Sequence, residues 1–260
     1  QELAAGTYGF YMLLAEDGNE TLMFSKNADA WGSFFYQPED IVLKVKIQSQ
    51  PTEFTNRLTY SFEDIGRDAA TLVLSWEEKK FPFKIETATD ELVFEEFRRR
   101  LPEMDDPVEY MAAASYCAQV KSHYEEGLRW IDKALESGRT FNRLNVKAGL
   151  LFRKEGKIEA AFPLTDESAQ IANSNELNQL GKRLLQLGQK EKALEYLELN
   201  VKKHPDDASA FDSLGDGYVA LGKSKKAIGS FKKSLALNPG PAVKQNAIDQ
   251  LKKLGVEYKP

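Results

Sequence analysis

The feature that most constrains the fold of this chain is a segment that repeats four times in its second part. The copies start at Val108, Asn142, Ser174 and Ala208, which lie 34, 32 and 34 residues apart. A unit of this length cannot bury an apolar face by itself, so neighbouring units have to stack on one another. The period therefore predicts a linear array of helix pairs from about Val108 onward.

The residues within each copy indicate how the predicted helices pack. Small residues stand where two helices must approach closely, and bulky apolar residues fill the seam between them. This spacing resembles the tetratricopeptide repeat, in which each repeat is a pair of helices. The last copy matches that pattern best, at Phe211, Leu214, Gly215, Tyr218, Ala227, Phe231 and Pro239.

Two further features of the repeat region follow from its sequence. A helix over 241–254 has one apolar side, and it should cover the open end of the array. Pro163 lies where the second helix of a repeat should run. Because a proline inside a helix costs about 3 kcal/mol, we expect a kink or a late helix start at this position.

The first part of the chain has a different hydrophobic period. Apolar and polar residues alternate over 41–49 and in several similar runs, as in strands with one buried face. We expect about six antiparallel strands, with a hairpin turn at 16–19 and a tight reversal at 77–79, followed by a short helix over 90–100. Pro82 cannot donate a ladder hydrogen bond, so it should lie at a sheet edge or remain unpaired.

The charge of the chain changes at the same place as its period. Residues 1–102 carry a net charge of −7, and residues 103–260 carry one of +2. We therefore place the domain boundary between Leu101 and Pro107. The predicted domains are an antiparallel β domain over 1–102 and a helical array with its capping helix over 103–260.

The β region has a set of distinctive segments, which are Gly-Thr-Tyr at 6–8, Trp31-Gly32, and the strands at 40–45 and 70–76. With these segments the region resembles domain-of-unknown-function family 2911. The resemblance covers about residues 3–88 and only the later part of the family's domain, and it implies a bacterial protein with no established activity that continues into tetratricopeptide repeats. The predicted fold class is thus α+β with two domains, an incomplete antiparallel β-sandwich-like domain followed by an α-helical solenoid.

An incomplete sandwich has a physical consequence. It exposes unpaired strand edges and an uncovered apolar face, which is an aggregation hazard. We therefore expect the missing strands to exist outside this numbering, either removed by proteolysis or present as a separate chain. The resemblance also implies an exported or periplasmic location, with a cytoplasmic one as the alternative.

Composition and motifs exclude several classes of function. A single Cys excludes a disulfide framework or a Cys-rich metal site, and two His residues leave little for a histidine-built centre. A net charge of −5 disfavours nucleic acid, and no apolar run approaches the roughly 18 residues of a membrane span. The phosphate-binding loop and the hydrolase and zinc-protease motifs are also missing from the sequence. We predict no enzyme activity, no cofactor and no metal.

The residues that suggest chemistry also have structural interpretations. Asp105-Asp106 and Asp206-Asp207 could form a cation site, but acidic residues before a helix also act as caps and favour the positive end of its dipole. We favour the second interpretation. Cys117 lies in a predicted helix and is expected to pack in the core rather than act as a nucleophile.

The inner face of the helical array is the predicted binding surface. In tetratricopeptide proteins the first helix of each repeat lines a concave groove, and its middle is basic here. An acidic peptide or a C-terminal carboxylate would fit this groove, although the pattern of the chaperone-tail carboxylate clamp is not reproduced. The alternative is that these are solvated helix faces. The candidate residues are Tyr116, Gln119, Arg143, Arg153, Lys154, Asn178 and Lys182, and the same positions of the last repeat are Asp212 and Asp216.

A run of aromatic residues offers a second candidate. Trp31, Phe34, Phe35 and Tyr36 could stack on a sugar or a peptide, or they could form a loop folded into the core. We favour packing in the core, which is the usual place of large aromatic side chains.

Three hypotheses on function remain. The first is a non-catalytic interaction or scaffold protein that binds a protein or peptide segment in the groove. The second is a β domain that binds a small molecule or glycan near Trp31 and Tyr36. The third is an enzyme whose catalytic part lies in the missing segment of the β domain.

Overall fold

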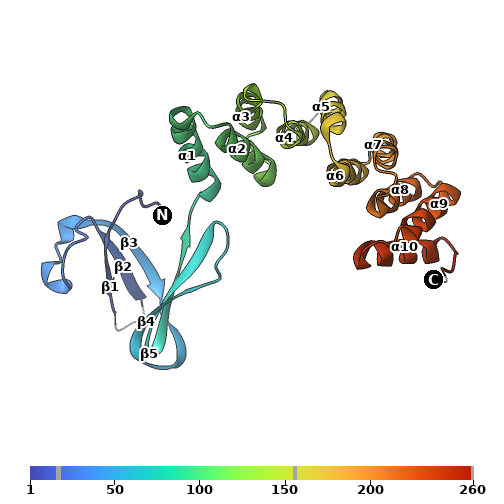
Figure 1. Cartoon of the computed structure of the whole chain (residues 1–260). Helices are drawn as coiled ribbons and strands as arrows, with labels where there is room; N and C mark the ends of the chain where they lie inside the picture. Colours follow the sequence, from blue (N-terminus) through green and yellow to red (C-terminus); the bar gives the residue numbers. More distant parts are fainter. Residues whose placement is uncertain (16–18, 155–156, 259–260) are drawn as a thin grey trace. The chain divides into compact units, whose positions relative to one another are not determined.

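The computed structural model describes residues 1–15, 19–154 and 157–258. The chain forms two compact units, Gln1–Glu95 and Glu96–Pro260, which we call the β unit and the helical unit. They divide within helix α1 (Thr89–Met104), whereas the sequence places the boundary near the end of that helix. Figure 1 shows both units along the chain, strands first and helices after.

The first three strands of the β unit form one antiparallel sheet. Strands β1 (Gly9–Leu13), β2 (Asn19–Ser25) and β3 (Ile41–Gln48) lie in the order β1-β2-β3. Met12 pairs with Leu22, which pairs with Val45, so the two-residue period of all three strands places apolar side chains on one face. The expected pairing of the first two strands is confirmed, but most of the predicted 16–19 turn lies outside the described residues.

The remaining two strands form a long hairpin. Strand β4 (Gln50–Glu63) pairs with β5 (Ala69–Glu86), which is continuous, so the predicted reversal at 77–79 is wrong. Glu77 has a left-handed backbone with a φ of 53°, but it pairs with Thr55 between two register shifts whose extra residues lie on β4, so the chain does not reverse there. Pairing ends at Lys80, which leaves Pro82 without a ladder partner on β4, as predicted.

The antiparallel sheets confirm the predicted fold class, in which the β-sandwich is incomplete. The described residues make one sheet of three strands and one of two, instead of about six strands. The rings of Phe10 on β1 and Phe83 on β5 stack at 5.8 Å, and buried side chains such as Leu22 and Leu74 complete a small core. The alternating apolar side of β4 is exposed, at Phe54, Leu58, Tyr60 and Phe62.

The helical unit is an array of helix pairs, as predicted. Each of four pairs packs within itself and against the next pair, and α10 packs on α8 and α9. The repeat pattern and the capping helix are therefore confirmed (Figure 1). The helices are α2 (Pro107–Val120), α3 (Tyr124–Glu136), α4 (Phe141–Arg153), α5 (Ile158–Ile171), α6 (Ser174–Gln186), α7 (Lys190–Lys203), α8 (Ala208–Ala220), α9 (Ser224–Ala236) and α10 (Pro241–Lys253).

The first helix of each pair begins at a side-chain cap. The side chains of Asp106 and Asp207 accept hydrogen bonds of 2.8 Å from backbone N–H groups two residues on. Asn173 caps α6 in a capping box with Glu176. The interpretation of the two Asp-Asp pairs as helix starts is thus supported by Asp106 and Asp207, one residue of each pair.

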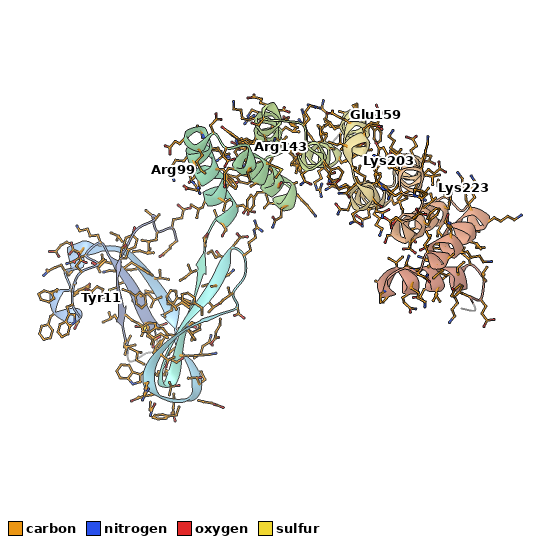
Figure 2. All side chains as sticks on the ribbon, viewed as in Figure 1. Tyr11, Arg99, Arg143, Glu159, Lys203 and Lys223 are labelled. Atoms are coloured by element: carbon orange, nitrogen blue, oxygen red, sulfur yellow. The ribbon has the colours of Figure 1, made fainter. Side chains whose placement is uncertain are left out.

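Pro163 lies inside α5, which begins at Ile158, so a late helix start is wrong. The missing N–H of Pro163 would have bonded to the carbonyl of Glu159, four residues earlier. Glu159 is exposed, so water can satisfy that carbonyl. At the other end of α5, Lys203 of α7, which is labelled in Figure 2, donates to the carbonyls of Gln170 and Ala172 at 3.1 and 3.2 Å.

Glycine lets the two helices of a repeat touch. A Cβ on Gly215 of α8 would lie 2.5 Å from the ring of Phe231 on α9, and one on Gly181 of α6 would lie 2.5 Å from Leu197 on α7. Gly229, on the exposed side of α9, has nothing within 4 Å of the same position. The seam between paired helices therefore tolerates no added methyl group at these positions.

We predict that Gly215→Ala destabilises the chain by about 1–3 kcal/mol, because the Phe231 ring must move out of a packed seam. The matched variant Gly229→Ala should instead stabilise it by about 0.5–1 kcal/mol, since alanine favours the helix. Urea unfolding of both variants measures the difference. Equal effects of the two substitutions would contradict the packing described here.

Candidate functional site

The first helices of the repeats follow one another along one side of the helical unit. Figure 1 shows α2, α4, α6, α8 and α10 on the inner side of its arc, with α3, α5, α7 and α9 on the outer side. Helix α2 contacts α4, α6 contacts α8, and α8 contacts α10. We call this surface the inner face. The groove residues predicted from the sequence belong to α2, α4 and α6 or directly follow α4.

The basic candidates on α4 have different environments. Arg143, labelled in Figure 2, donates from Nη1 to the Gly138 carbonyl at 3.0 Å, back across the start of its helix. Arg153 is exposed and donates from Nη1 to the Gly149 carbonyl at 2.9 Å. Lys154 forms an ion pair with Glu125 of α3, so its charge is already compensated within the unit.

The candidates on α2 and α6 also differ from one another. Asn178 is buried, and its Oδ1 accepts a hydrogen bond of 2.9 Å from Asn200 of α7. Lys182 is exposed and has no ion-pair partner among the described residues. On α2, Gln119 is exposed and the Tyr116 ring meets Phe97 edge-on at 5.9 Å.

Arg183 is a groove residue that the sequence did not indicate. Its Nη1 reaches from α6 to α4, where it donates to Oδ1 of Asn145 at 2.6 Å and to the Asn145 carbonyl at 3.3 Å. The side chain is half-buried beside Arg153. Burial is the main cause that lowers the pKa of Arg183, and the positive charge of Arg153 lowers it further. Arg183 occupies the tenth position of its helix. The groove candidates were chosen from the second, fifth, ninth, twelfth and thirteenth positions, so this residue was not among them.

The acidic end of the inner face lies between α8 and α10. Asp212 is 5% exposed, and both its carboxylate oxygens accept from Nδ2 of Asn246, at 3.0 and 2.9 Å. Gln250 donates to Asp216 at 3.3 Å. Burial raises the pKa of Asp212 to about 6 and also raises that of Asp216, while the hydrogen bonds and the charge of Lys182 act in the opposite direction.

Other groups that could carry chemistry are held in structural roles. Cys117 is fully buried against Gly127, and burial raises the pKa of its thiol to about 11. At neutral pH the thiol is therefore protonated and is a poor nucleophile or metal ligand. In the described residues no three His, Cys, Asp or Glu side chains come together as metal ligands would.

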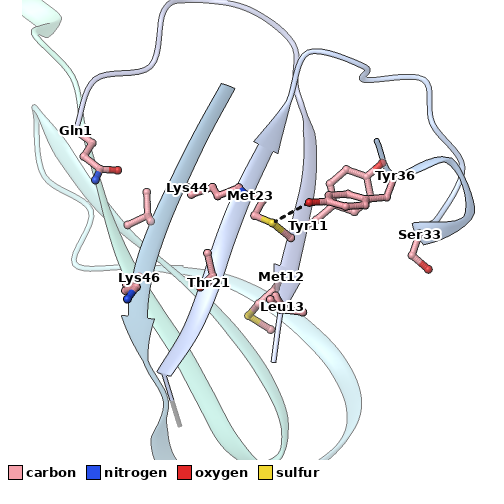
Figure 3. Close-up of a pocket in the computed structure, with 11 residues that line it drawn as sticks. Gln1, Tyr11, Met12, Leu13, Thr21, Met23, Ser33, Tyr36, Lys44 and Lys46 are labelled. Atoms are coloured by element: carbon pink, nitrogen blue, oxygen red, sulfur yellow. Dashed lines mark hydrogen bonds between the residues drawn. The ribbon is translucent and has the colours of Figure 1, made fainter. Parts of the chain in front are cut away.

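The β unit has a depression of about 1040 Å³ on its three-stranded sheet, on the face that carries Tyr11, Met23 and Lys44 (Figure 3). Tyr11 and Met23 line it from β1 and β2, and Lys44 and Lys46 line it from β3. The Tyr36 ring meets Tyr11 edge-on at 5.6 Å, and its hydroxyl donates to Sδ of Met23 at 3.8 Å. The depression thus combines an aromatic wall with two lysines.

The aromatic run next to this depression is not part of the core, contrary to our expectation. Trp31 is 83% exposed, Phe34 90% and Phe35 58%, and only Tyr36 folds back on the sheet. These residues lie in the connection between β2 and β3, where a short 3₁₀ helix, Ser33–Phe35, has no buried residue. In the described structure no element packs over this connection, so its rings face solvent.

Comparisons with known proteins agree with the resemblances found in the sequence. Residues 1–85 match the family described as "Protein of unknown function (DUF2911)". A comparison with curated protein sequences found no significant match. No helix among the described residues is long and apolar enough to cross a lipid bilayer.

Solved structures similar to the chain include tetratricopeptide-repeat proteins. YrrB, described as "a TPR protein with an unusual peptide-binding site", is 23% identical over 60% of this chain and 82% of its own, with a TM-score of 0.39. MamA from Desulfovibrio magneticus is 22% identical over 56% and 84%, with a TM-score of 0.40. The C-terminal part of a TPR repeat-containing protein from Cytophaga hutchinsonii is 18% identical over 64% and 72%, with a TM-score of 0.45.

The raised pKa of Asp212 predicts a pH effect on stability. The folded chain holds a proton on this carboxylate up to about pH 6, whereas the unfolded chain, with a pKa of 3.8, does not. Stability from this group therefore increases as the pH falls from about 7 to 4, by about 2 kcal/mol at most. Asp212→Asn should remove this pH-dependent contribution, as seen by comparing urea unfolding of the variant and the parent chain at pH 7 and pH 5.

The matched control for this measurement is Asp249→Asn on the exposed side of α10. It should leave the pH dependence close to that of the parent chain. If Asp212→Asn and Asp249→Asn changed the pH profile equally, the burial of Asp212 would not be the cause.

Proposed function

We propose that this chain is a non-catalytic interaction protein whose inner face binds a segment of a partner protein. The observation that supports this most directly is the state of its charges. Lys182, Arg153 and the half-buried Arg183 have no ion-pair partner among the described residues.

The proposed mechanism is capture of an extended or helical segment without any chemical step. The acidic side chains of the bound segment would lie over α4 and α6, where arginine can donate charge-assisted hydrogen bonds to them. The acidic pair on α8 would repel them, so the acidic part of the segment is confined to one end of the inner face. Charge then sets both the preferred partner and its direction along the groove.

We expect the full chain to enrich acidic peptides from a random peptide library. Charge reversal at Arg143, Arg153 and Lys182 together should lower the affinity for the best enriched peptide by about tenfold or more, and should reduce its salt dependence. Fluorescence anisotropy at several salt concentrations measures both quantities.

A matched triple charge reversal at Lys202, Lys225 and Lys232, all exposed on the outer helices, controls for net charge. This variant should bind nearly as well as the parent chain once salt screens long-range attraction. Equal losses in the two triple variants would argue against the inner face as the binding surface.

An exported or periplasmic location forms part of the same proposal. It rests on the resemblance of the β unit to a family whose members are usually exported, and fractionation of cells that produce the full-length protein would test it.

A second candidate function is binding of a small molecule or glycan by the β unit. The depression on the three-stranded sheet favours it, because aromatic rings that stack on sugars adjoin two lysines there. The exposed Trp31 belongs to the same connection as Tyr36 and extends the available aromatic surface.

For this candidate we predict a glycan-array signal that Trp31→Ala or Tyr36→Ala abolishes. Trp76→Ala is the control, because its half-exposed indole lies on β5 instead. A signal that survives both substitutions, or that Trp76→Ala removes equally, would contradict binding at this surface.

A further inference from the structure

We infer that Arg153 and Arg183 together form a site for a single carboxylate, where α6 reaches across to α4. The inference rests on the proposed function and deepens it, because it names the chemical group that the inner face recognises. It also assigns a binding role to Arg183 and a positioning role to Asn145 and Gly149.

The two guanidinium groups are held in place and still have donors to spare. Among the described residues, Arg153 makes its hydrogen bond through Nη1 to the Gly149 carbonyl, and Arg183 makes both of its own through Nη1 to Asn145. Their Nε and Nη2 groups therefore remain available. A guanidinium fork that presents these two donors side by side matches the two oxygens of a carboxylate.

The two groups converge on one point of the inner face. The place where a Cβ of Gly149 would lie is 3.4 Å from Nη1 of Arg183, 3.5 Å from its Nη2, and 3.5 Å from Nη1 of Arg153. Gly149 lies inside α4, and its backbone does not have the positive φ that favours glycine. A Cβ at this position would be in ordinary van der Waals contact with both groups, so both guanidinium groups lie against the backbone of α4 at the same residue.

No acidic side chain of the helices that form this site compensates the two charges. The sequence of α4 contains no Asp or Glu, and α6 contains only Glu176, whose carboxylate accepts a hydrogen bond from the Asn173 backbone. Holding two positive groups together, one of them half-buried, costs free energy. A bound carboxylate would offset that repulsion and would also satisfy the spare donors.

The test uses three ten-residue peptides and the full chain. The first has alternating glutamates with acetylated and amidated ends, the second has glutamine in their place, and the third is the glutamine peptide with a free C-terminal carboxylate. Calorimetry should show the first or the third binding at least about tenfold more tightly than the second. Which of the two binds tells whether the carboxylate comes from side chains or from a chain end; equal affinity of all three overturns the inference.

Variants then locate the binding site. Arg153→Gln and Arg183→Gln should each lower the affinity about tenfold or more, and the double variant little further, because both arginines hold one carboxylate. Arg183→Lys keeps the charge without the fork and should also bind weakly. Arg129→Gln on outer helix α3 is the matched control; effects no larger than this control would overturn the inference.

The carboxylate site and the proposed function fail in different ways. If the peptide enriched from the library binds Arg153→Gln and Arg183→Gln as tightly as the parent, the groove remains a binding surface and the site is wrong. If no peptide binds the chain, the proposed function fails and the site is judged with sodium acetate. At constant ionic strength acetate should raise the Tm of the parent but not of Arg183→Gln, and a larger rise with inorganic phosphate would overturn the choice of a carboxylate.

Discussion

Close contact between the two helices of each repeat is the constraint on which the helical unit depends. Gly127 meets Cys117, Gly181 meets Leu197 and Gly215 meets Phe231, each so closely that a Cβ would lie 2.9 Å or less from the facing side chain. Such contacts hold a pair together at its seam and leave one side of each first helix without a partner in its own pair. Stacked in order, these sides form the inner face, where Arg153 and Lys182 are exposed and are not part of a seam.

Much of the helical unit could be predicted because its structure follows from short-range patterns. The glycine and the bulky residue that meet at a seam lie about sixteen residues apart, at Gly181 and Leu197 or at Gly215 and Phe231, and they recur with the repeat. The β unit was harder, because its strands depend on distant partners. Glu77 has the backbone of a turn, yet it pairs with Thr55 of β4 within one long strand. The exposure of Trp31 likewise depends on what packs over a connection, which no local pattern records.

The same distinction explains the candidate site. Arg143, Arg153 and Lys182 could be placed on the inner face from their positions within a repeat. Arg183 could not, because its orientation depends on its hydrogen bonds to Asn145 in the preceding repeat. Asn178 was placed there too, but its side chain is buried and bonded to Asn200 in its own pair. Contacts within and between repeats therefore decide which of the candidate side chains are exposed.

The last helix has a second effect besides covering the apolar end of the array. Leu251 on α10 is fully buried, and Asn246 on the same helix covers the carboxylate of Asp212. Proteolytic cleavage at the exposed Gly240 would release both contacts at once. The shortened protein would expose a new apolar end, and Asp212 would regain the acidity of a surface aspartate. Trimming of the C-terminus would thus change the electrostatic potential of the remaining surface as well as its tendency to associate.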